Sequence, residues 1–221
     1  MPACVRRAER VLFFGGSFDP PHAAHAELPF AAAERWWPEG PRPWVVFVPA
    51  ARSPHKANAP APDRHRAEML RIALRDRRRW WIWEDELARA EAGEPSFWAD
   101  TWRRARAAFG ASEAVFLIGA DQALAMHRWS RYREIWRDAV VLARPGTDAA
   151  ALHKGLERAG VWTPAEIDRW AARTVPLPML DASSTAVRAA LADPDRRNGP
   201  IPGLDEGVRR YAVERGLYAP A

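Results

Sequence analysis

A pair of glycines and two histidines stand close together near the start of the chain. Gly15 and Gly16 follow the apolar run at residues 11–14, and His22 and His25 come shortly after. Glycines let a backbone approach a ligand closely and adopt positive φ. The helix expected after the turn presents free N–H groups and the positive end of its dipole, which favour anions. A spacing of three puts both imidazole rings on one face of that helix. The segment therefore predicts a site for the phosphates of a nucleoside triphosphate.

Two other interpretations of this segment stay open. The glycine pair could form a turn in which the histidines only cap a helix. Histidines three residues apart on a helix could also ligate zinc, although no obvious third ligand stands nearby. We therefore predict no metal held by these side chains.

The composition agrees with an anionic ligand without singling out nucleic acid. The 221-residue chain has a net charge of +5, and Lys56 and Lys154 are the only lysines among its 33 basic residues. The arginines are scattered, and their excess is typical of a genome-wide composition bias. Scattered charge argues only weakly for a polynucleotide, so we predict a small-molecule partner and no nucleic acid.

The chain also has the composition of a cytoplasmic protein. Cys4 is the only cysteine, so no internal disulfide can form and a reducing compartment is expected. No charge-free apolar run reaches the roughly 18 residues of a membrane span, and no signal-peptide core is present. We predict a cytoplasmic protein without membrane attachment, and the sequence is compatible with a homo-oligomer.

Short apolar runs alternate with amphipathic segments along the chain. Strands are expected at residues 11–14, 45–48, 80–83, 114–118, 139–143 and 174–177. Helices are expected at residues 21–37, 63–74, 99–109, 184–191 and 205–215, with Asp63 as an N-cap and two short helices within 148–173. This alternation predicts an α/β fold, a Rossmann-like doubly wound parallel sheet with helices on both faces.

The domain organisation follows from the same pattern. We predict a Rossmann-like domain over residues 1–192 and a small C-terminal helical extension of that domain over residues 193–221, after a Pro- and Gly-rich link. Ligands of such sheets lie beyond the carboxyl ends of the strands. Three strands end in polar or glycine-rich turns, at residues 15–17, 119–121 and 144–146, so a nucleotide is expected there.

Residues 15–25 resemble the GG-x-F-D-P-x-H-x-x-H motif of the nucleotidylyltransferase superfamily. Further motifs in the right order resemble those of the bacterial nicotinate-nucleotide adenylyltransferases over nearly the whole chain. They are Pro54-His55-Lys56, Arg66 with Met69-Leu70, Glu86-Leu87 with Arg89, PSFWADT at 95–101, FLIGAD at 116–121, Trp129, Arg144-Pro145-Gly146, SSTAVR at 183–188, Tyr211 and GLY at 216–218.

The resemblance implies which residues bind ATP and assist the reaction. The implied catalytic residues are His22, His25, Lys56 and Arg188. The implied ATP-binding residues are Gly15, Gly16, Ser17, Phe18, His22, His25, Gly119, Asp121, Arg144, Ser184, Thr185 and Arg188. On the residues alone, Asp121 could equally be a helix N-cap, and the 183–188 segment could be a plain N-cap followed by a surface arginine.

The resemblance also implies a site for the second substrate, the acceptor of the adenylyl group. Its residues would be Asp19, His55, Lys56, Phe97, Trp98, Trp129 and Ser130. Trp129 would stack on the pyridine ring, although core packing is an equal alternative from the residues alone. The chain departs from the family here, since the S-Y-T motif reads Ser96-Phe97-Trp98 and Ser130 stands where an aromatic residue is usual.

The reaction implied by the resemblance joins ATP and nicotinate mononucleotide to give deamido-NAD and pyrophosphate. Mg²⁺ would accompany the triphosphate with few protein ligands. The alternatives are another phosphorylated acceptor, either nicotinamide mononucleotide or phosphopantetheine, or a non-catalytic module that binds nucleotide or RNA.

Overall fold

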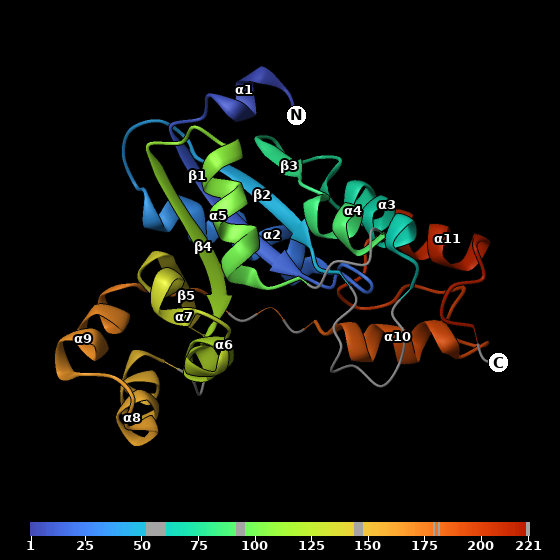
Figure 1. The fold of residues 1–221 in the computed structure, drawn as a ribbon. Helices are drawn as coiled ribbons and strands as arrows, with labels where there is room; N and C mark the ends of the chain where they lie inside the picture. The colour runs from blue at the N-terminus through green and yellow to red at the C-terminus, as the bar shows by residue number, and fades with distance from the viewer. Residues whose placement is uncertain (52–60, 92–95, 144–147, 179, 181, 220–221) are drawn as a thin grey trace. The chain divides into compact units, whose positions relative to one another are not determined.

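The computed structural model describes residues 1–51, 61–91, 96–143, 148–178, 180 and 182–219. In chain order its elements are α1 (Ala3–Arg6), β1 (Arg10–Gly16), α2 (Ala23–Trp36), β2 (Trp44–Pro49), α3 (Asp63–Leu74), β3 (Trp80–Ile82), α4 (Asp85–Glu91), α5 (Trp98–Ala108), β4 (Glu113–Gly119), α6 (Ala120–Ala125), η1 (Met126–Arg128), α7 (Tyr132–Ile135), η2 (Trp136–Asp138), β5 (Ala139–Ala143), α8 (Ala149–Ala159), α9 (Pro164–Ala172), β6 (Thr174–Pro176), α10 (Ser184–Ala192) and α11 (Glu206–Glu214) (Figure 1).

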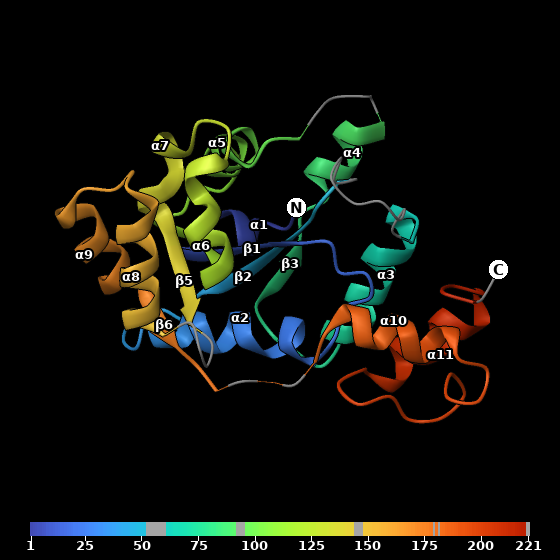
Figure 2. The ribbon, with the colours of Figure 1, turned by 90° about the horizontal axis from the view of Figure 1, so that it is seen from below.

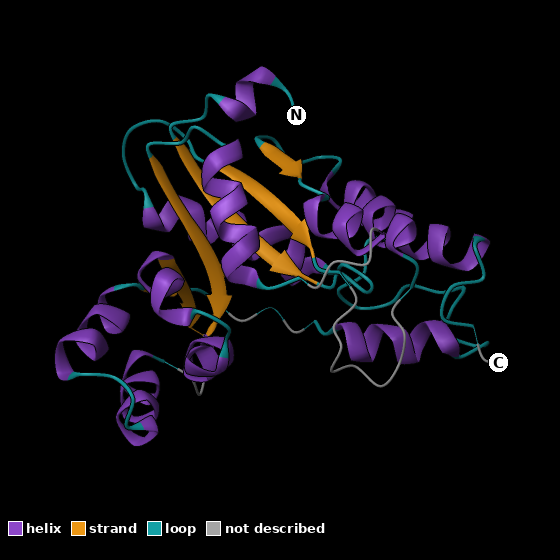
Figure 3. Ribbon diagram, in the orientation of Figure 1, coloured by secondary structure: helices purple, strands orange, loops and turns teal. Residues whose placement is uncertain are grey.

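The predicted parallel sheet is confirmed. Among the described residues, six strands form one sheet in the order β3-β2-β1-β4-β5-β6. The strands β1 and β4 run in the same direction, with Leu12 opposite Val115, and β4 pairs in parallel with β5 (Figure 3). All residues of β5 are buried, as expected for a strand covered on both faces.

The chain divides into two compact units, each built from several chain segments. Unit 1 comprises residues 1–15, 29–46 and 95–179, and unit 2 comprises residues 16–28, 47–94 and 180–221. None of the described helices is long and apolar enough to cross a membrane.

In unit 1, helix α5 packs on β1 and β4 through aromatic side chains. Trp102 lies edge-on to Phe13, with ring centroids 5.4 Å apart, and contacts Phe116 in the same manner at 5.1 Å. Such edge-to-face pairs add to the burial of apolar area. The two helices predicted within residues 148–173 are α8 and α9. A capping box of Thr163 and Glu166 starts α9.

In unit 2, the C-terminal helices pack on α3. Helix α11 packs on α3, and α10 packs on α11 (Figures 1 and 2). Their shared core contains the buried side chains of Met69, Val187, Leu191 and Val208. The predicted extension therefore contributes to the core of unit 2.

Three predicted helix starts differ from the structure by one or two residues. Helix α2 begins at Ala23 rather than at Pro21, α5 at Trp98 rather than at Ala99, and α11 at Glu206 rather than at Asp205. Helix α3 has Pro62 as its N-cap, so the prediction of Asp63 as N-cap is wrong by one residue. The carboxylate of Asp63 instead accepts a hydrogen bond from Arg66 at 2.6 Å.

Candidate functional site

The turn after β1 is held in place by a buried aromatic ring. Phe18 adopts a φ of 48°, is buried, and packs edge-on against Phe47, with ring centroids 5.9 Å apart. A Cβ atom on Gly16 would lie 3.0 Å from the Phe18 ring. Glycine at position 16 therefore leaves room for the ring beneath the turn. The positive φ predicted for the glycine pair is wrong, because neither Gly15 nor Gly16 adopts it.

The two histidines lie together, as their spacing predicts. The rings of His22 and His25 stack with centroids 3.8 Å apart and an angle of 29° between them. The backbone N–H of His22 donates to Nδ1 of His25 at 3.3 Å. This bond ties the His25 ring to the backbone just before α2.

His22 also borders a cavity of about 430 Å³ within unit 2, which is in the range of ligand pockets. Its lining includes Pro21, Ala23 and Gly203. The helix end beside it differs from the prediction of free N–H groups, because the Ala23 N–H donates to the Gly203 carbonyl at 2.7 Å. The Ala23 N–H is therefore not free for an anion, and Glu27, Asp76 and Asp205 also line the cavity.

The start of α10 reaches this turn. Ser184 Oγ donates to the Pro20 carbonyl at 3.0 Å, and Arg188 Nη1 donates to the Asp19 carbonyl at 2.7 Å. Arg188 also lies 3.4 Å from the Thr185 hydroxyl. The N-cap of α10 is Ser183, whose side chain accepts from the Ala186 N–H. The alternative interpretation is therefore right about the cap, but Arg188 is hydrogen-bonded to the turn and is not a plain surface arginine.

Arg66 is a site-supporting residue for which the sequence predicted no role. Its side chain is 1% exposed and donates to the carbonyl oxygens of Ser17 at 2.6 Å and Ala50 at 2.8 Å. It also pairs with Asp63 at 2.6 Å. A buried guanidinium needs such partners to offset its lost hydration. The signal available in the sequence was an arginine three residues before the buried Met69 in the R-x-x-M-L motif.

Asp19, predicted to bind the acceptor, is 8% exposed and already occupied by protein donors. Its Oδ1 accepts from the Tyr218 hydroxyl at 2.7 Å and from the Ala61 N–H at 3.1 Å. Asp19 thus braces the turn within unit 2. Tyr218 is a second residue for which the sequence predicted no role.

In unit 1, Trp98 lies against the end of β1. A Cβ on Gly15 would meet the Trp98 ring at 2.9 Å, and the indole contacts Phe116 edge-on at 5.5 Å. Among the described residues, the Trp98 indole N–H has no hydrogen-bond partner. The neighbouring Phe97 is 47% exposed. The Trp98 N–H is buried in this arrangement, whereas the Phe97 ring is exposed to a ligand.

Gly119 and Asp121 occupy the end of β4. Gly119 is the N-cap of α6, so the alternative of Asp121 as N-cap is wrong. A Cβ on Gly119 would lie 2.5 Å from Asp121 Oδ1, so a larger residue there would displace the Asp121 carboxylate. Asp121 is exposed and accepts from the Gln122 side chain at 2.9 Å.

An ion pair joins the two segments predicted to bind the acceptor. Asp100, in the first turn of α5 after Phe97 and Trp98, accepts from Arg131, which directly follows Trp129 and Ser130. This hydrogen bond is the main cause that lowers the pKa of Asp100. Trp129 is half-buried and Ser130 is exposed, whereas the core tryptophans of unit 1, Trp136 and Trp170, are buried.

The remaining predicted residues, His55, Lys56 and Arg144, lie outside the described residues. The others fall into two groups. Residues 16–25 come together with Ser184, Thr185 and Arg188 in unit 2, and Gly15, Phe97, Trp98, Gly119, Asp121, Trp129 and Ser130 belong to unit 1. No cluster of three or more His, Cys, Asp or Glu side chains suited to a metal ion occurs within the described ranges.

Comparisons with known proteins place these features in context. The sequence model of the cytidylyltransferase-like family matches residues 13–190. A probable nicotinate-nucleotide adenylyltransferase of Chromobacterium violaceum is 34% identical, over 95% of this chain and 98% of that protein. One of Symbiobacterium thermophilum is 32% identical, with 95% of each chain covered.

A likeness is also found among solved structures. The nicotinic acid mononucleotide adenylyltransferase of Plasmodium falciparum, complexed with NaAD, superposes with a TM-score of 0.67. The alignment covers 95% of this chain and 97% of that one. At 14% identity, this likeness concerns the fold alone.

Proposed function

Because this chain belongs to the cytidylyltransferase-like family, and within it to the nicotinate-nucleotide adenylyltransferases, we propose that it transfers the adenylyl group of ATP to nicotinate mononucleotide. The products are deamido-NAD and pyrophosphate, a step of NAD biosynthesis. A phosphate oxygen of the mononucleotide attacks the α-phosphorus of ATP and forms the new P–O bond. The bond from that phosphorus to the bridging oxygen breaks, and pyrophosphate leaves with the electron pair.

The single observation that carries the proposal is a cluster of three side chains in unit 2. His22 and His25 stack on each other, and Arg188 is hydrogen-bonded to the turn that precedes them. The attacking phosphate is already an anion, so the step needs neither a general base nor a protein nucleophile. What it needs is alignment and stabilisation of charge on the α-phosphate and the leaving pyrophosphate. Donors on imidazole and guanidinium groups suit this role.

The proposed donors act on different parts of ATP. The rings of His22 and His25 contact the phosphates near the reacting centre, and Ser184, Thr185 and Arg188 bind the outer phosphates. Lys56 adds a compact charge beside the phosphates. Asp121 and Gly119 hold the ribose, and Arg144 lies near the adenosine.

On the acceptor side, we propose that Trp129 stacks on the pyridine ring. An electron-poor ring over an indole face is a favourable pair. The indole N–H of Trp98, which has no acceptor among the described residues, suits a carboxylate such as that of nicotinate. A nicotinamide ring would offer a neutral carbonyl instead, and this favours the acid.

Mg²⁺ is proposed to arrive with ATP. The predicted phosphate-binding side chains are histidines, hydroxyls and arginine, which suit phosphate oxygens better than they suit Mg²⁺, a cation that prefers oxygen ligands and retains water. The bound ion would neutralise charge on the triphosphate, with its ligands drawn from phosphate oxygens and water. We further propose that the enzyme is cytoplasmic and acts on small-molecule substrates.

The test is pyrophosphate release from ATP with either mononucleotide, with deamido-NAD identified by mass spectrometry. Nicotinate mononucleotide should be turned over and nicotinamide mononucleotide should be much poorer. Phosphopantetheine should give no product, and RNA should cause no salt-dependent mobility shift. An enzyme that turned over neither mononucleotide would refute the proposal, and a salt-dependent RNA shift in its place would support the binding module.

A further inference from the structure

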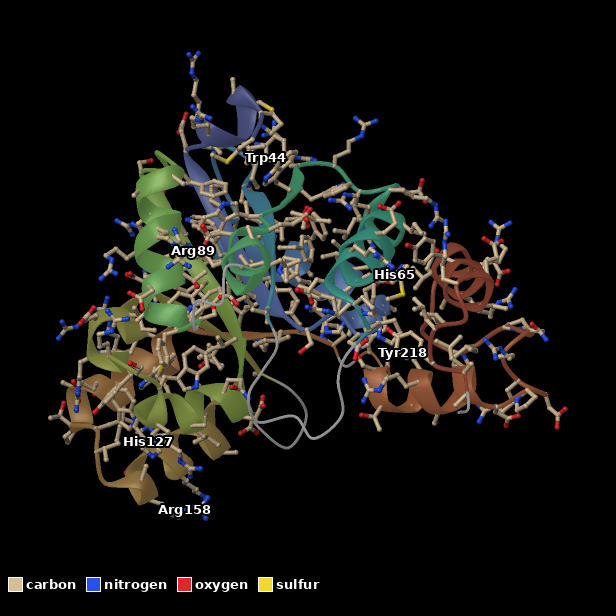
Figure 4. The ribbon with its side chains drawn as sticks, turned by 45° about the vertical axis from the view of Figure 1, so that its right-hand side comes forward. Trp44, His65, Arg89, His127, Arg158 and Tyr218 are labelled. Carbon is tan, nitrogen blue, oxygen red and sulfur yellow. The ribbon has the colours of Figure 1, made fainter. Side chains whose placement is uncertain are left out.

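The C-terminal Tyr218 is hydrogen-bonded to the turn that carries the predicted phosphate ligands. Figure 4 labels Tyr218, which follows α11 and Gly216, whose φ is 62°. The Tyr218 hydroxyl donates to Asp19 Oδ1 at 2.7 Å. Both residues belong to unit 2. The sequence separation of 199 positions makes this one of the longest-range contacts of the chain.

Asp19 connects Tyr218 to Arg188. The side chain of Asp19 accepts from Tyr218, while its backbone carbonyl accepts from Arg188 Nη1 at 2.7 Å. The next carbonyl, that of Pro20, accepts from Ser184. A shift of the Asp19 side chain would therefore also move the carbonyl oxygen that orients the Arg188 guanidinium.

The local backbone indicates that this contact is strongly determined by its surroundings. Tyr218 has a φ of 60° and Phe18, next to Asp19, has a φ of 48°. Non-glycine residues keep such angles only where neighbouring contacts enforce them, and they are enriched at functional sites. Burial and the bond to Asp19 raise the pKa of the Tyr218 hydroxyl, so it remains a protonated donor at neutral pH.

We propose that Tyr218 is a positioning residue for adenylyl transfer, whose hydroxyl fixes Asp19 and thereby holds Arg188 and the turn before His22 in the geometry that binds the ATP phosphates. The inference rests on the proposed function. It does not make Tyr218 a catalytic residue, because the hydroxyl is directed to Asp19.

Tyr211 offers a matched control in the same unit. It too is a C-terminal tyrosine with a hydrogen-bonded hydroxyl, which lies 2.9 Å from His65 Nδ1 on α3. Figure 4 labels His65 on that helix. Neither His65 nor Tyr211 has a role proposed above in binding ATP or the acceptor. Loss of the Tyr211 hydroxyl therefore costs a comparable hydrogen bond elsewhere.

The experiment compares Tyr218→Phe with Tyr211→Phe and the wild type. Tyr218→Phe should raise the KM for ATP about tenfold, in the range for a hydrogen bond to a charged group, and leave the KM for the mononucleotide unchanged. Tyr211→Phe should keep both KM values, while thermal melting shows a similar Tm loss in both variants. Equal ATP KM values for the two variants would overturn the inference.

A double-mutant cycle tests the route through Asp19. If Tyr218 acts by orienting Arg188, then Tyr218→Phe should weaken ATP binding much less in an Arg188→Lys background than in the wild type. Calorimetry with a non-hydrolysable ATP analogue and no acceptor gives these affinities. Independent, multiplicative effects would contradict the inference. This readout separates it from the proposed function, since absence of turnover with both mononucleotides would refute the latter alone.

Discussion

Asp100 and Arg131 form an ion pair that ties the first turn of α5 to the segment following Trp129. Both residues belong to unit 1, and both flank side chains expected at the acceptor site. Removal of the pair should loosen the acceptor site while leaving the stacked histidines of unit 2 in place.

We therefore expect Arg131→Gln to raise the KM for the mononucleotide about tenfold, because small displacements of positioning groups are costly, with the KM for ATP nearly unchanged. Steady-state kinetics with each substrate varied in turn measures this. Arg103→Gln is the control, since Arg103 pairs with the same carboxylate at 2.5 Å but lies on the exposed side of α5. Equal effects of the two variants would show that Arg131 has no special role.

The stability of the folded protein should depend on the ionisation of the Glu113 carboxylate. It accepts from Arg10 and from the Trp37 indole, both at 2.8 Å, and these bonds lower its pKa below the ordinary value of 4.5. A depressed folded pKa stabilises the protein above the unfolded pKa, and this contribution is lost as pH falls through the folded value. Glu113→Gln should thus have a lower Tm than the wild type at pH 7, and the gap should narrow as the pH falls below the ordinary pKa of 4.5. A gap independent of pH would contradict this account.

His22 should matter more to the transition state than to ATP binding. His22→Ala should lower kcat by about 100-fold or more, as for loss of a preorganised donor to developing charge. His153→Ala is the control, because His153 lies on α8 and pairs only weakly with Glu157 at 3.4 Å. A kcat within a few-fold of wild type for His22→Ala would exclude the proposed role.

Because Gly15 contacts the Trp98 ring, a substitution at Trp98 should compensate for a larger residue at position 15. Gly15→Ala should reduce activity, because the added methyl would lie 2.9 Å from the indole ring. Trp98→Thr in the same chain should restore much of that loss by removing the ring. Gly110→Ala is the matched control, since its Cβ would meet only the Arg6 carbonyl at an ordinary 3.6 Å. If Trp98→Thr did not restore activity, the contact with the indole ring would not be the reason for the loss in Gly15→Ala.

Arg66 should dominate the stability of the turn after β1. Arg66→Met leaves Asp63 and the carbonyls of Ser17 and Ala50 without their donor, at a cost of about 3 kcal/mol in unfolding free energy. Arg71→Met, on the exposed face of the same helix, should cost less than about 1 kcal/mol. Urea unfolding compares the two, and similar losses would show that burial of Arg66 is not the reason.

The order of strands and helices along the chain could be predicted because the local pattern of apolar residues determines it. Apolar runs such as residues 139–143 form fully buried strands. His22 and His25 stack as predicted, although α2 begins only at Ala23 and His22 lies just before it. Helix starts were less predictable, since whether Pro62 or Asp63 adopts extended φ and ψ depends on packing. The predicted boundary between residues 192 and 193 stays a prediction.

The supporting contacts of the site could not be predicted from local patterns. The Gly203 carbonyl takes the Ala23 N–H, and Arg66 binds backbone oxygens that carry no sequence signature. Tyr218 fits a C-terminal family motif, but nothing in that motif names Asp19 as its partner. Only the folded chain brings these groups together.

The separation between Asp19 and Tyr218 has a consequence for synthesis on the ribosome. Tyr218 is added 199 positions after Asp19. Since chains are made from the N-terminus onward, the Asp19 carboxylate has no phenol donor until those positions have been translated. A nascent chain therefore contains His22 and His25 long before it contains the tyrosine that holds the turn before them.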